Sequence, residues 1–315
     1  MTGFICEVTP RCNLDCIFCY NTWRDPQSQQ PEPLKPQAFA QLLVPALKQA
    51  QASWLAFAGG EPLLYPGLEK LMAQVVKALP KIKVGIASNG TALTKKRLTS
   101  LVQSGLSYVE LSLFSASAAR YQALTGKNLL VHAHKAALAV KEAGLPLTVA
   151  CTLLADNTDE FEKIALTALA LGADVFAVNP FTPTGYGKQR RDELELSRKQ
   201  LEKFLEKAQS LAQKLPLPFV VTLPVEDCVI AHARYPHLRF SRCECANGKW
   251  VIDPQGYLRI CEQSHDRIGR LTEYSFKELS ARACVKAFHA NTRKPECLVC
   301  PQYGECGGGC RFRAS

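Results

Sequence analysis

The sequence contains no apolar run as long as the roughly 18 residues that a membrane-spanning helix needs. Its N-terminus shows no basic segment followed by an apolar stretch, which excludes a signal peptide. It also has no tight Lys/Arg tract interleaved with aromatic residues, so nucleic acid is not expected as a partner despite the formal net charge of +10. We therefore expect a cytoplasmic protein with no membrane partner.

Cysteine, in contrast, is abundant, with 14 in 315 residues. Thiols stay reduced inside cells, where grouped cysteines indicate metal binding more often than disulfides. Cys6 and Cys151 are exceptions, because they fall inside apolar segments where a small buried side chain is expected.

Between residue 3 and about residue 222, short apolar runs alternate with longer amphipathic stretches. The expected strands are Gly3–Val8, Trp54–Ala58, Val84–Ala87, Tyr108–Leu113, Leu147–Leu153, Val175–Val178 and Phe219–Thr222. The expected helices are Pro36–Gln51, Gly67–Leu79, Thr94–Ser104, Leu129–Ala143, Asp159–Leu171 and Ser197–Lys214, with Ser197 as an N-cap and Gly105, Gly144 and Gly172 at helix ends. Repeated strand–helix units predict an α/β fold with a parallel sheet, either open or closed into a barrel.

The pattern changes near residue 225. Trp250–Asp253 and Tyr257–Ile260 predict a hairpin around Pro254–Gly256, and one helix is expected at about Ser275–Ala290. The last nineteen residues hold four cysteines and too few apolar residues to form a stable core without a bound metal or disulfide bonds. We expect two domains, residues 1–225 and 226–315, the second organised by metal.

Three cysteines with the spacing C-x3-C-x2-C follow the first strand: Cys12, Cys16 and Cys19. They should lie at the C-terminal edge of the sheet, where α/β folds place their chemistry. Three thiolates are one short of the four that normally hold a cubane iron–sulfur cluster, so one iron would stay open to a substrate. A structural zinc site is the alternative, but it needs a fourth ligand, and the first histidine of the chain is His132.

This triad, with the aromatic Phe18 before its last cysteine, resembles the signature of the radical S-adenosylmethionine (SAM) superfamily. The resemblance implies a partial (β/α)6 TIM-like barrel and a [4Fe–4S] cluster on Cys12, Cys16 and Cys19. It also implies that SAM is cleaved reductively to a 5′-deoxyadenosyl radical, which abstracts hydrogen from a substrate.

Further elements resemble the family in the same order along the chain. The segment from Gly59 to Pro62 resembles its GGEP motif, although alone it reads as an ordinary strand-to-helix turn. Arg120 could pair with the SAM carboxylate, or it could be a solvated helix cation. The cofactor-binding residues that the resemblance implies are Phe18, Gly59, Gly60, Glu61, Pro62, Ser88, Asn89, Ser112, Arg120 and Asn179.

The C-terminal cysteines resemble a SPASM domain, the small Cys-rich iron–sulfur domain that carries auxiliary [4Fe–4S] clusters in peptide-modifying relatives; two zinc sites are the alternative. The resemblance implies one cluster on Cys245, Cys261 and Cys310, with Cys243 as a further ligand, and a second on Cys297, Cys300 and Cys306. The family usually has one more cysteine downstream, so the second cluster would use Cys228, Cys284, a carboxylate or a substrate atom, or keep an open iron.

The leading functional hypothesis is therefore a radical SAM oxidoreductase that modifies a peptide or protein side chain, with an electron donor such as flavodoxin or ferredoxin. The chain begins almost at its first strand, which favours a small-molecule cofactor precursor as the alternative substrate. A non-catalytic iron–sulfur electron carrier is the alternative of another class. Glu262, next to Cys261, is either a solvated side chain or the catalytic base that takes a proton from the substrate.

Overall fold

In the computed structural model, which describes residues 1–24, 30–290 and 295–312, the strands join into one eleven-stranded sheet. The strands are β1 (Gly3–Thr9), β2 (Trp54–Gly59), β3 (Lys83–Ser88), β4 (Leu106–Ser112), β5 (Leu147–Leu153), β6 (Val175–Pro180), β7 (Phe219–Val221), β8 (Leu238–Phe240), β9 (Lys249–Ile252), β10 (Tyr257–Arg259) and β11 (Arg267–Arg270). From β1 to β8, consecutive strands pair in parallel; on the other side of β1 lies β9, also parallel, followed by antiparallel β10 and β11.

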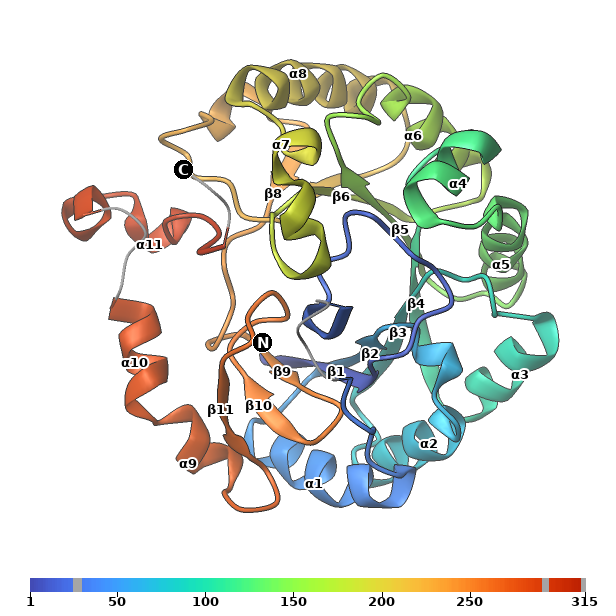
Figure 1. Ribbon diagram of the computed structural model, residues 1–315, viewed down its shortest axis with the longest axis vertical. Coiled ribbons are helices and arrows are strands. Elements are labelled where there is room, and N and C mark those ends of the chain that lie inside the picture. Colours follow the sequence, from blue (N-terminus) through green and yellow to red (C-terminus); the bar gives the residue numbers. More distant parts are fainter. Residues whose placement is uncertain (25–29, 291–294, 313–315) are drawn as a thin grey trace.

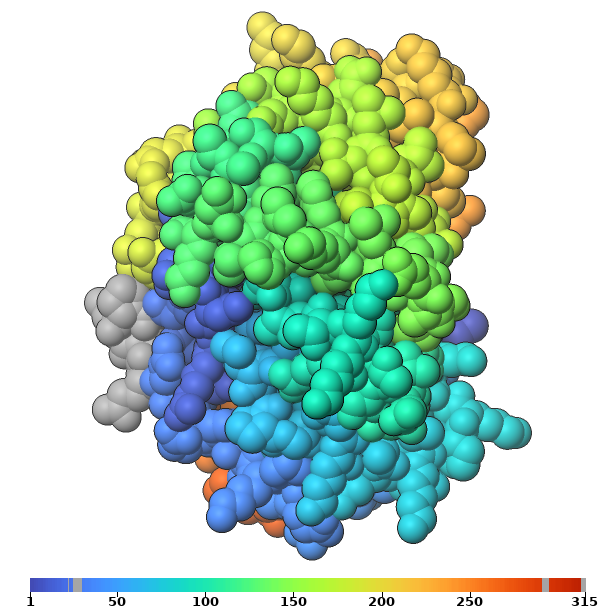
Figure 2. Space-filling view, turned by 90° about the vertical axis from the view of Figure 1, so that its right-hand side faces the viewer, coloured from blue at the N-terminus to red at the C-terminus, as the bar shows by residue number. Residues whose placement is uncertain are grey.

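Helices cover the outside of this curved sheet (Figure 1). The helices of the described residues are α1 (Pro36–Gln49), α2 (Leu68–Ala78), α3 (Lys95–Gln103), α4 (Ala118–Thr125), α5 (Leu130–Glu142), α6 (Phe161–Ala170), α7 (Arg191–Leu194), α8 (Arg198–Lys214), α9 (Phe276–Ser280), α10 (Ala283–Ala290) and α11 (Tyr303–Cys306). Of these, α7 and α11 lie apart from the outer layer (Figure 1). From the side of α3 to α6, Figure 2 shows the side chains of this helical layer covering the sheet. The expected partial barrel of strand–helix units is confirmed.

Local sequence signals account for most of the helix ends. Ser197 caps α8 and forms a capping box with Gln200. Gly105, Gly144 and Gly172 end their helices in the left-handed region, with φ of +105°, +71° and +80°. Glycine has no Cβ and adopts this conformation without steric cost. The expected positions of these three glycines at helix ends are therefore confirmed.

The two faces of the barrel strands differ in character. In β4, Val109 and Leu111 are buried against the helices, while the alternate residues Tyr108 and Glu110 face a cavity inside the barrel. The core therefore lies between the sheet and its helices, and the interior of the barrel keeps polar side chains.

The segment beyond residue 225 continues the sheet. The expected hairpin is confirmed as β9 and β10, and β9 pairs with β1 while β8 pairs with β7. The single helix expected at Ser275–Ala290 was wrong: α9 ends at Ser280 and α10 begins at Ala283. Arg282 lies at this break and donates a 2.6 Å hydrogen bond to the Ile268 carbonyl, which fixes the chain at that point. Among the described residues, no helix is both long enough and apolar enough to cross a membrane.

Candidate active site

The loop that carries Cys12, Cys16 and Cys19 begins where β1 ends and is fixed by backbone hydrogen bonds. The amides of Asp15 and Ile17 donate to the carbonyls of Thr125 and Leu124 at the end of α4, at 2.8 and 3.1 Å. The Cys19 carbonyl accepts a 2.9 Å hydrogen bond from the amide of Gly187. The loop is therefore held by segments far away in the sequence.

Its three thiols are half-buried and close enough to influence one another electrostatically. Burial raises the pKa of Cys19 to about 11 and raises those of Cys12 and Cys16 as well, while the nearby Arg24 guanidinium lowers all three. These thiols are therefore protonated without a metal and would release protons on binding one.

The spacing of the thiols indicates which metal group they fit. A single zinc ion, with Zn–S bonds of about 2.3 Å, would bring its sulfurs to about 3.8 Å from one another. Among the described residues, the three Sγ atoms do not form a group within 4.8 Å. A cubane cluster binds each thiolate at a separate iron and so needs this wider spacing. Half-buried thiols with this separation fit the cluster better than zinc.

The glycines after β2 lie against the segment that leads to Cys12. The amide of Gly60 donates to the Thr9 carbonyl at 2.7 Å, and that of Glu61 to the Arg11 carbonyl at 2.8 Å. A Cβ on Gly60 would lie 2.1 Å from the Arg11 oxygen, which no side chain could tolerate. The lack of a side chain at Gly60 thus allows a close contact with the chain's own backbone.

The carboxylate of Glu61 is buried, and its acceptor positions are taken by protein donors. It accepts hydrogen bonds from the Ser88 hydroxyl at 2.7 Å, the Asn89 amide at 2.8 Å and the Leu63 amide at 3.1 Å. Glu61 therefore fixes the loop after β3. Any contact of this motif with SAM remains a prediction.

That loop in turn contacts the thiol loop through Asn89. The Asn89 Nδ2 donates to Asn13 Oδ1 at 2.9 Å and lies 3.9 Å from the Sγ of Cys12. The Leu14 amide is a second donor to the same sulfur, at 3.4 Å. Such N–H donors stabilise negative charge on a cluster thiolate and tune its potential.

A cavity of about 610 Å³ lies inside the barrel. Phe18 and Tyr20 of the thiol loop line one part of its wall, and Asn179 at the end of β6 lines another. Of the other expected cofactor residues, Arg120 pairs with Asp159 at the surface and does not line the cavity. Ser112 ends β4, at the same edge as Ser88 and Asn89.

Four C-terminal cysteines line the same cavity: Cys243, Cys245, Cys261 and Cys310. The Sγ atoms of Cys245 and Cys261 and a carboxylate oxygen of Glu262 lie within 4.8 Å of one another. A hydrogen bond to the Cys245 thiol, together with burial, raises the pKa of Cys243. Cys243, Cys245 and Cys261 thus lie together and Cys310 lines the same cavity, whereas the short spacing of Cys245, Cys261 and Glu262 also suits a single zinc ion, the alternative named above.

The remaining three cysteines of the C-terminal array lie in the tail. Cys297 and Cys300 share a turn, and α11 ends at Cys306. Gly307, Gly308 and Gly309 then all adopt positive φ, between +66° and +75°, and the Cys310 amide donates to the Pro224 carbonyl at 3.1 Å. This glycine turn carries Cys310 away from its neighbours to the cavity. Cys228 and Cys284 are exposed, whereas Cys6 and Cys151 are fully buried in strands, as predicted.

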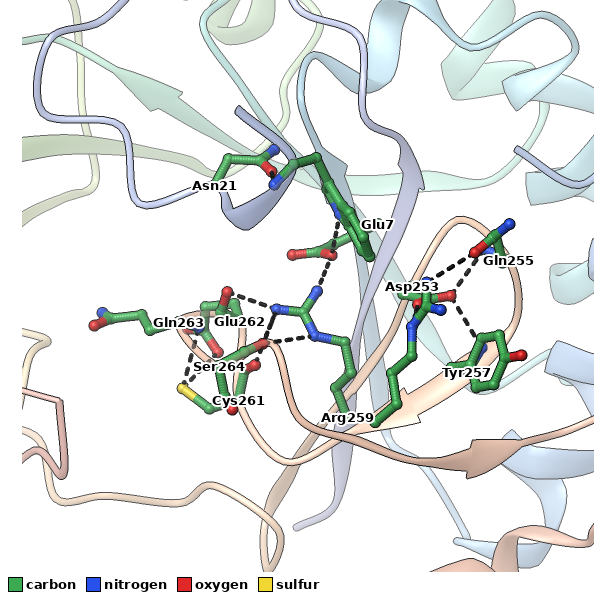
Figure 3. Close-up of polar contacts among 12 residues, drawn as sticks. Glu7, Asn21, Asp253, Gln255, Tyr257, Arg259, Cys261, Glu262, Gln263 and Ser264 are labelled. Carbon is green, nitrogen blue, oxygen red and sulfur yellow. Dashed lines mark hydrogen bonds and ion pairs between the residues drawn. The ribbon is translucent and has the colours of Figure 1, made fainter. Parts of the chain in front are cut away.

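No local sequence signal identifies Arg259, which connects the two cysteine regions. Its buried guanidinium pairs with Glu7 in β1 and donates to the carbonyls of Cys261, Glu262 and Ser264 (Figure 3). Trp23 donates to the same Glu7 carboxylate at 3.2 Å. The loop that presents Cys261 is therefore tied to the strand that leads to Cys12.

Glu262, the candidate base, lines the cavity and pairs with Lys249 at 2.7 Å. Burial alone would raise the pKa of Glu262, but the Lys249 ammonium outweighs it and lowers that pKa. The carboxylate is therefore ionised at neutral pH and able to accept a proton.

Comparison with known proteins agrees with this site. The sequence profile of the Radical SAM superfamily matches residues 6–168. The chain therefore belongs to the radical SAM superfamily, and it is an enzyme whose cofactors are a [4Fe–4S] cluster and SAM, with a C-terminal Cys-rich region of the SPASM type.

Among its relatives is the PqqA peptide cyclase of Granulibacter bethesdensis, 26% identical over 329 residues, which span 99% of this chain and 83% of the relative. The enzyme of the same name from Methylorubrum extorquens is 27% identical over 331 residues, 99% of this chain and 80% of the relative. Streptococcus suis SuiB bound to the precursor peptide SuiA has the same fold, with a TM-score of 0.78, 18% identity and coverage of 98% of this chain and 71% of SuiB. So does anSMEcpe with bound AdoMet, with a TM-score of 0.77, 18% identity and coverage of 99% and 90%.

Proposed function

We propose that this radical SAM enzyme oxidises a side chain of a peptide substrate that binds in the barrel cavity. The observation that carries the proposal is that one cavity is bordered both by the loop of Cys12, Cys16 and Cys19 and by the C-terminal thiols. A substrate placed there would lie beside the loop of the N-terminal thiols and against the C-terminal thiols. Relatives that cyclise the peptide PqqA, and a relative in fold that binds the peptide SuiA, support a peptide substrate.

The cofactors supply the reductive cleavage of SAM, with one electron entering, to methionine and a radical that removes a hydrogen atom from the substrate. The protein positions these reactants. Cys12, Cys16 and Cys19 would hold the cluster, and Asn89 would donate toward Cys12. The Phe18 ring packs edge-on against Phe114, at 4.6 Å between centroids, and forms an apolar wall that excludes water from a reactive site.

Oxidation of the substrate requires that one further electron and one proton leave it. Cys245, Cys261 and Cys310 stand at the cavity wall, where an auxiliary cluster on them would take the electron. Glu262 would take the proton, because Lys249 holds its carboxylate ionised and oriented. We further propose Cys297, Cys300 and Cys306 as ligands of a second auxiliary cluster, and a flavodoxin or ferredoxin as the source of the first electron.

The test uses anaerobically reconstituted enzyme with SAM, dithionite and peptides translated from short open reading frames next to its gene. We expect one peptide to lose two hydrogen atoms by mass spectrometry, and the Cys16→Ala variant to modify none. If the enzyme forms 5′-deoxyadenosine but modifies only small metabolites, the peptide substrate is wrong.

A further inference from the structure

Glu110 places a carboxylate inside the barrel that the reaction outlined above does not use. It lies in the middle of β4 and lines the cavity, while its strand neighbours Val109 and Leu111 point outward into the core. In register beside it are Ala87 on β3 and Thr148 on β5. The side chain therefore stands among small neighbours and faces the open space of the cavity.

Within the part of the chain that the structure describes, no hydrogen-bond donor reaches this carboxylate. Its electrostatic neighbours are Lys249 and Glu262, and they act in opposite directions. The nearby hydroxyl of Tyr108 donates to the Leu55 carbonyl at 3.2 Å and so is directed elsewhere. Burial accordingly raises the pKa of Glu110.

The cations that line the cavity have partners other than Glu110. Lys249 pairs with Glu262, and Arg242 with Glu244, both at 2.7 Å. Arg311 donates to the Gly307 carbonyl and to the hydroxyl of Tyr303, both at 3.2 Å. Glu110 is thus left without an ion-pair partner among the described residues.

Two further polar atoms on the cavity wall lack a partner among the described residues. Thr182 lines the cavity with only 5% of its surface exposed, and its Oγ1 is unpaired. The Oε1 of Gln263, an acceptor, is buried and also unpaired. Buried polar groups normally have partners, so the cavity fits a polar ligand that offers a hydrogen-bond donor to Gln263 Oε1 and a donor or an acceptor to Thr182.

We propose that Glu110 binds a cationic side chain, a lysine or an arginine, of the substrate segment seated in the cavity. This inference rests on the peptide-modifying function proposed above and names the class of peptide. A charge-assisted hydrogen bond in a cavity contributes specificity as well as affinity, because an uncharged side chain would leave the carboxylate without a partner.

The test is a binding selection that needs no turnover. Reconstituted enzyme with SAM, kept anaerobic, is incubated with a random heptapeptide library, and the bound peptides are sequenced. We expect wild-type enzyme to enrich lysine or arginine at one position by about tenfold to a hundredfold over the Glu110→Gln variant. Equal enrichment by the two proteins, or none by the wild type, would overturn the proposal.

The controls separate this inference from the proposed function. Glu142→Gln removes an exposed carboxylate that pairs with Lys95 at the surface, and should select peptides as the wild type does. Glu110→Gln should keep the iron content and the circular dichroism spectrum of the wild type, which shows that the variant is folded and loaded. Selection of basic peptides that are then never modified would contradict the proposed function but leave the role of Glu110 standing.

Discussion

The guanidinium of Arg259 pairs with the carboxylate of Glu7, and both side chains are buried. The two residues lie 252 positions apart in the sequence, so the contact joins the first strand to the last part of the sheet. Because Arg259 also donates to the carbonyls of Cys261 and Glu262, one side chain positions a C-terminal thiol relative to the N-terminal thiol loop.

Replacing Arg259 with Met should therefore disturb the C-terminal metal site and the stability together. It leaves Glu7 buried without its cation and frees three carbonyls, so we expect a loss of about 3–5 kcal/mol in free energy of unfolding. Iron content should fall by about four per chain as the loop of Cys261 loosens. Urea unfolding and iron analysis measure the two effects. The matched variant is Glu7→Gln, in which Arg259 still donates to the carbonyls of Cys261, Glu262 and Ser264, and this variant should retain its iron. An Arg259→Met protein with full iron and unchanged stability would refute the link.

Gly60→Ala should damage the site far more than an equivalent change elsewhere. Its new Cβ would collide with the Arg11 carbonyl and push apart the GGEP segment and the thiol loop. We expect a stability loss of about 1–3 kcal/mol and loss of SAM binding, measured by calorimetry. Gly144→Ala is the control: its φ is positive, unlike that of Gly60, but a Cβ there meets nothing within 4 Å. It should cost about 1–2 kcal/mol of stability and leave SAM binding intact; equal effects of both changes on SAM binding would exclude the steric explanation.

Asn89 should tune the cluster held by the N-terminal thiols. Its Nδ2 lies 3.9 Å from the Sγ of Cys12, and removing this donor withdraws stabilisation of the reduced, more negative cluster. We expect Asn89→Ala to lower the reduction potential by on the order of 20–60 mV, the one-electron equivalent of a hydrogen bond. Asn89→Asp, which adds a negative charge, should lower it further. A potentiometric titration followed by electron paramagnetic resonance measures the reduction potentials of the wild type and the two variants. Unchanged potentials in both variants would rule out this role.

Glu262→Gln should separate radical formation from product formation. The amide cannot take a proton, so modified peptide should fall by about a hundredfold or more while 5′-deoxyadenosine continues to form. The ratio of the two products, measured by chromatography on protein of wild-type iron content, checks the prediction. An unchanged yield of modified peptide would remove Glu262 from the reaction.

The thiol loop and the barrel were predictable because their signals are local. Spacing alone placed Cys12, Cys16 and Cys19 after a strand, and glycines such as Gly105 and Gly172 marked helix ends through a conformation that other residues avoid. The hairpin formed by β9 and β10 followed in the same way from its Pro/Gly turn.

The residues that sequence reasoning missed depend on contacts between distant segments. Nothing near Glu7 indicates Arg259, and Lys249 meets Glu262 only because β9 adds to the barrel beside β1. For Glu110 a signal existed: the run Val109–Leu113 alternates apolar and polar residues, whereas a strand buried on both faces should be apolar throughout. That alternation indicates a strand lining a cavity.

The most direct test of this account compares wild-type enzyme with Cys16→Ala, both reconstituted anaerobically and given dithionite and SAM. The wild type should form 5′-deoxyadenosine, and its reduced cluster should change its electron paramagnetic resonance spectrum when SAM is added. The variant should lose about four irons and form none of this product. Wild-type protein that binds only zinc at Cys12, Cys16 and Cys19, or a variant that still cleaves SAM, would contradict it.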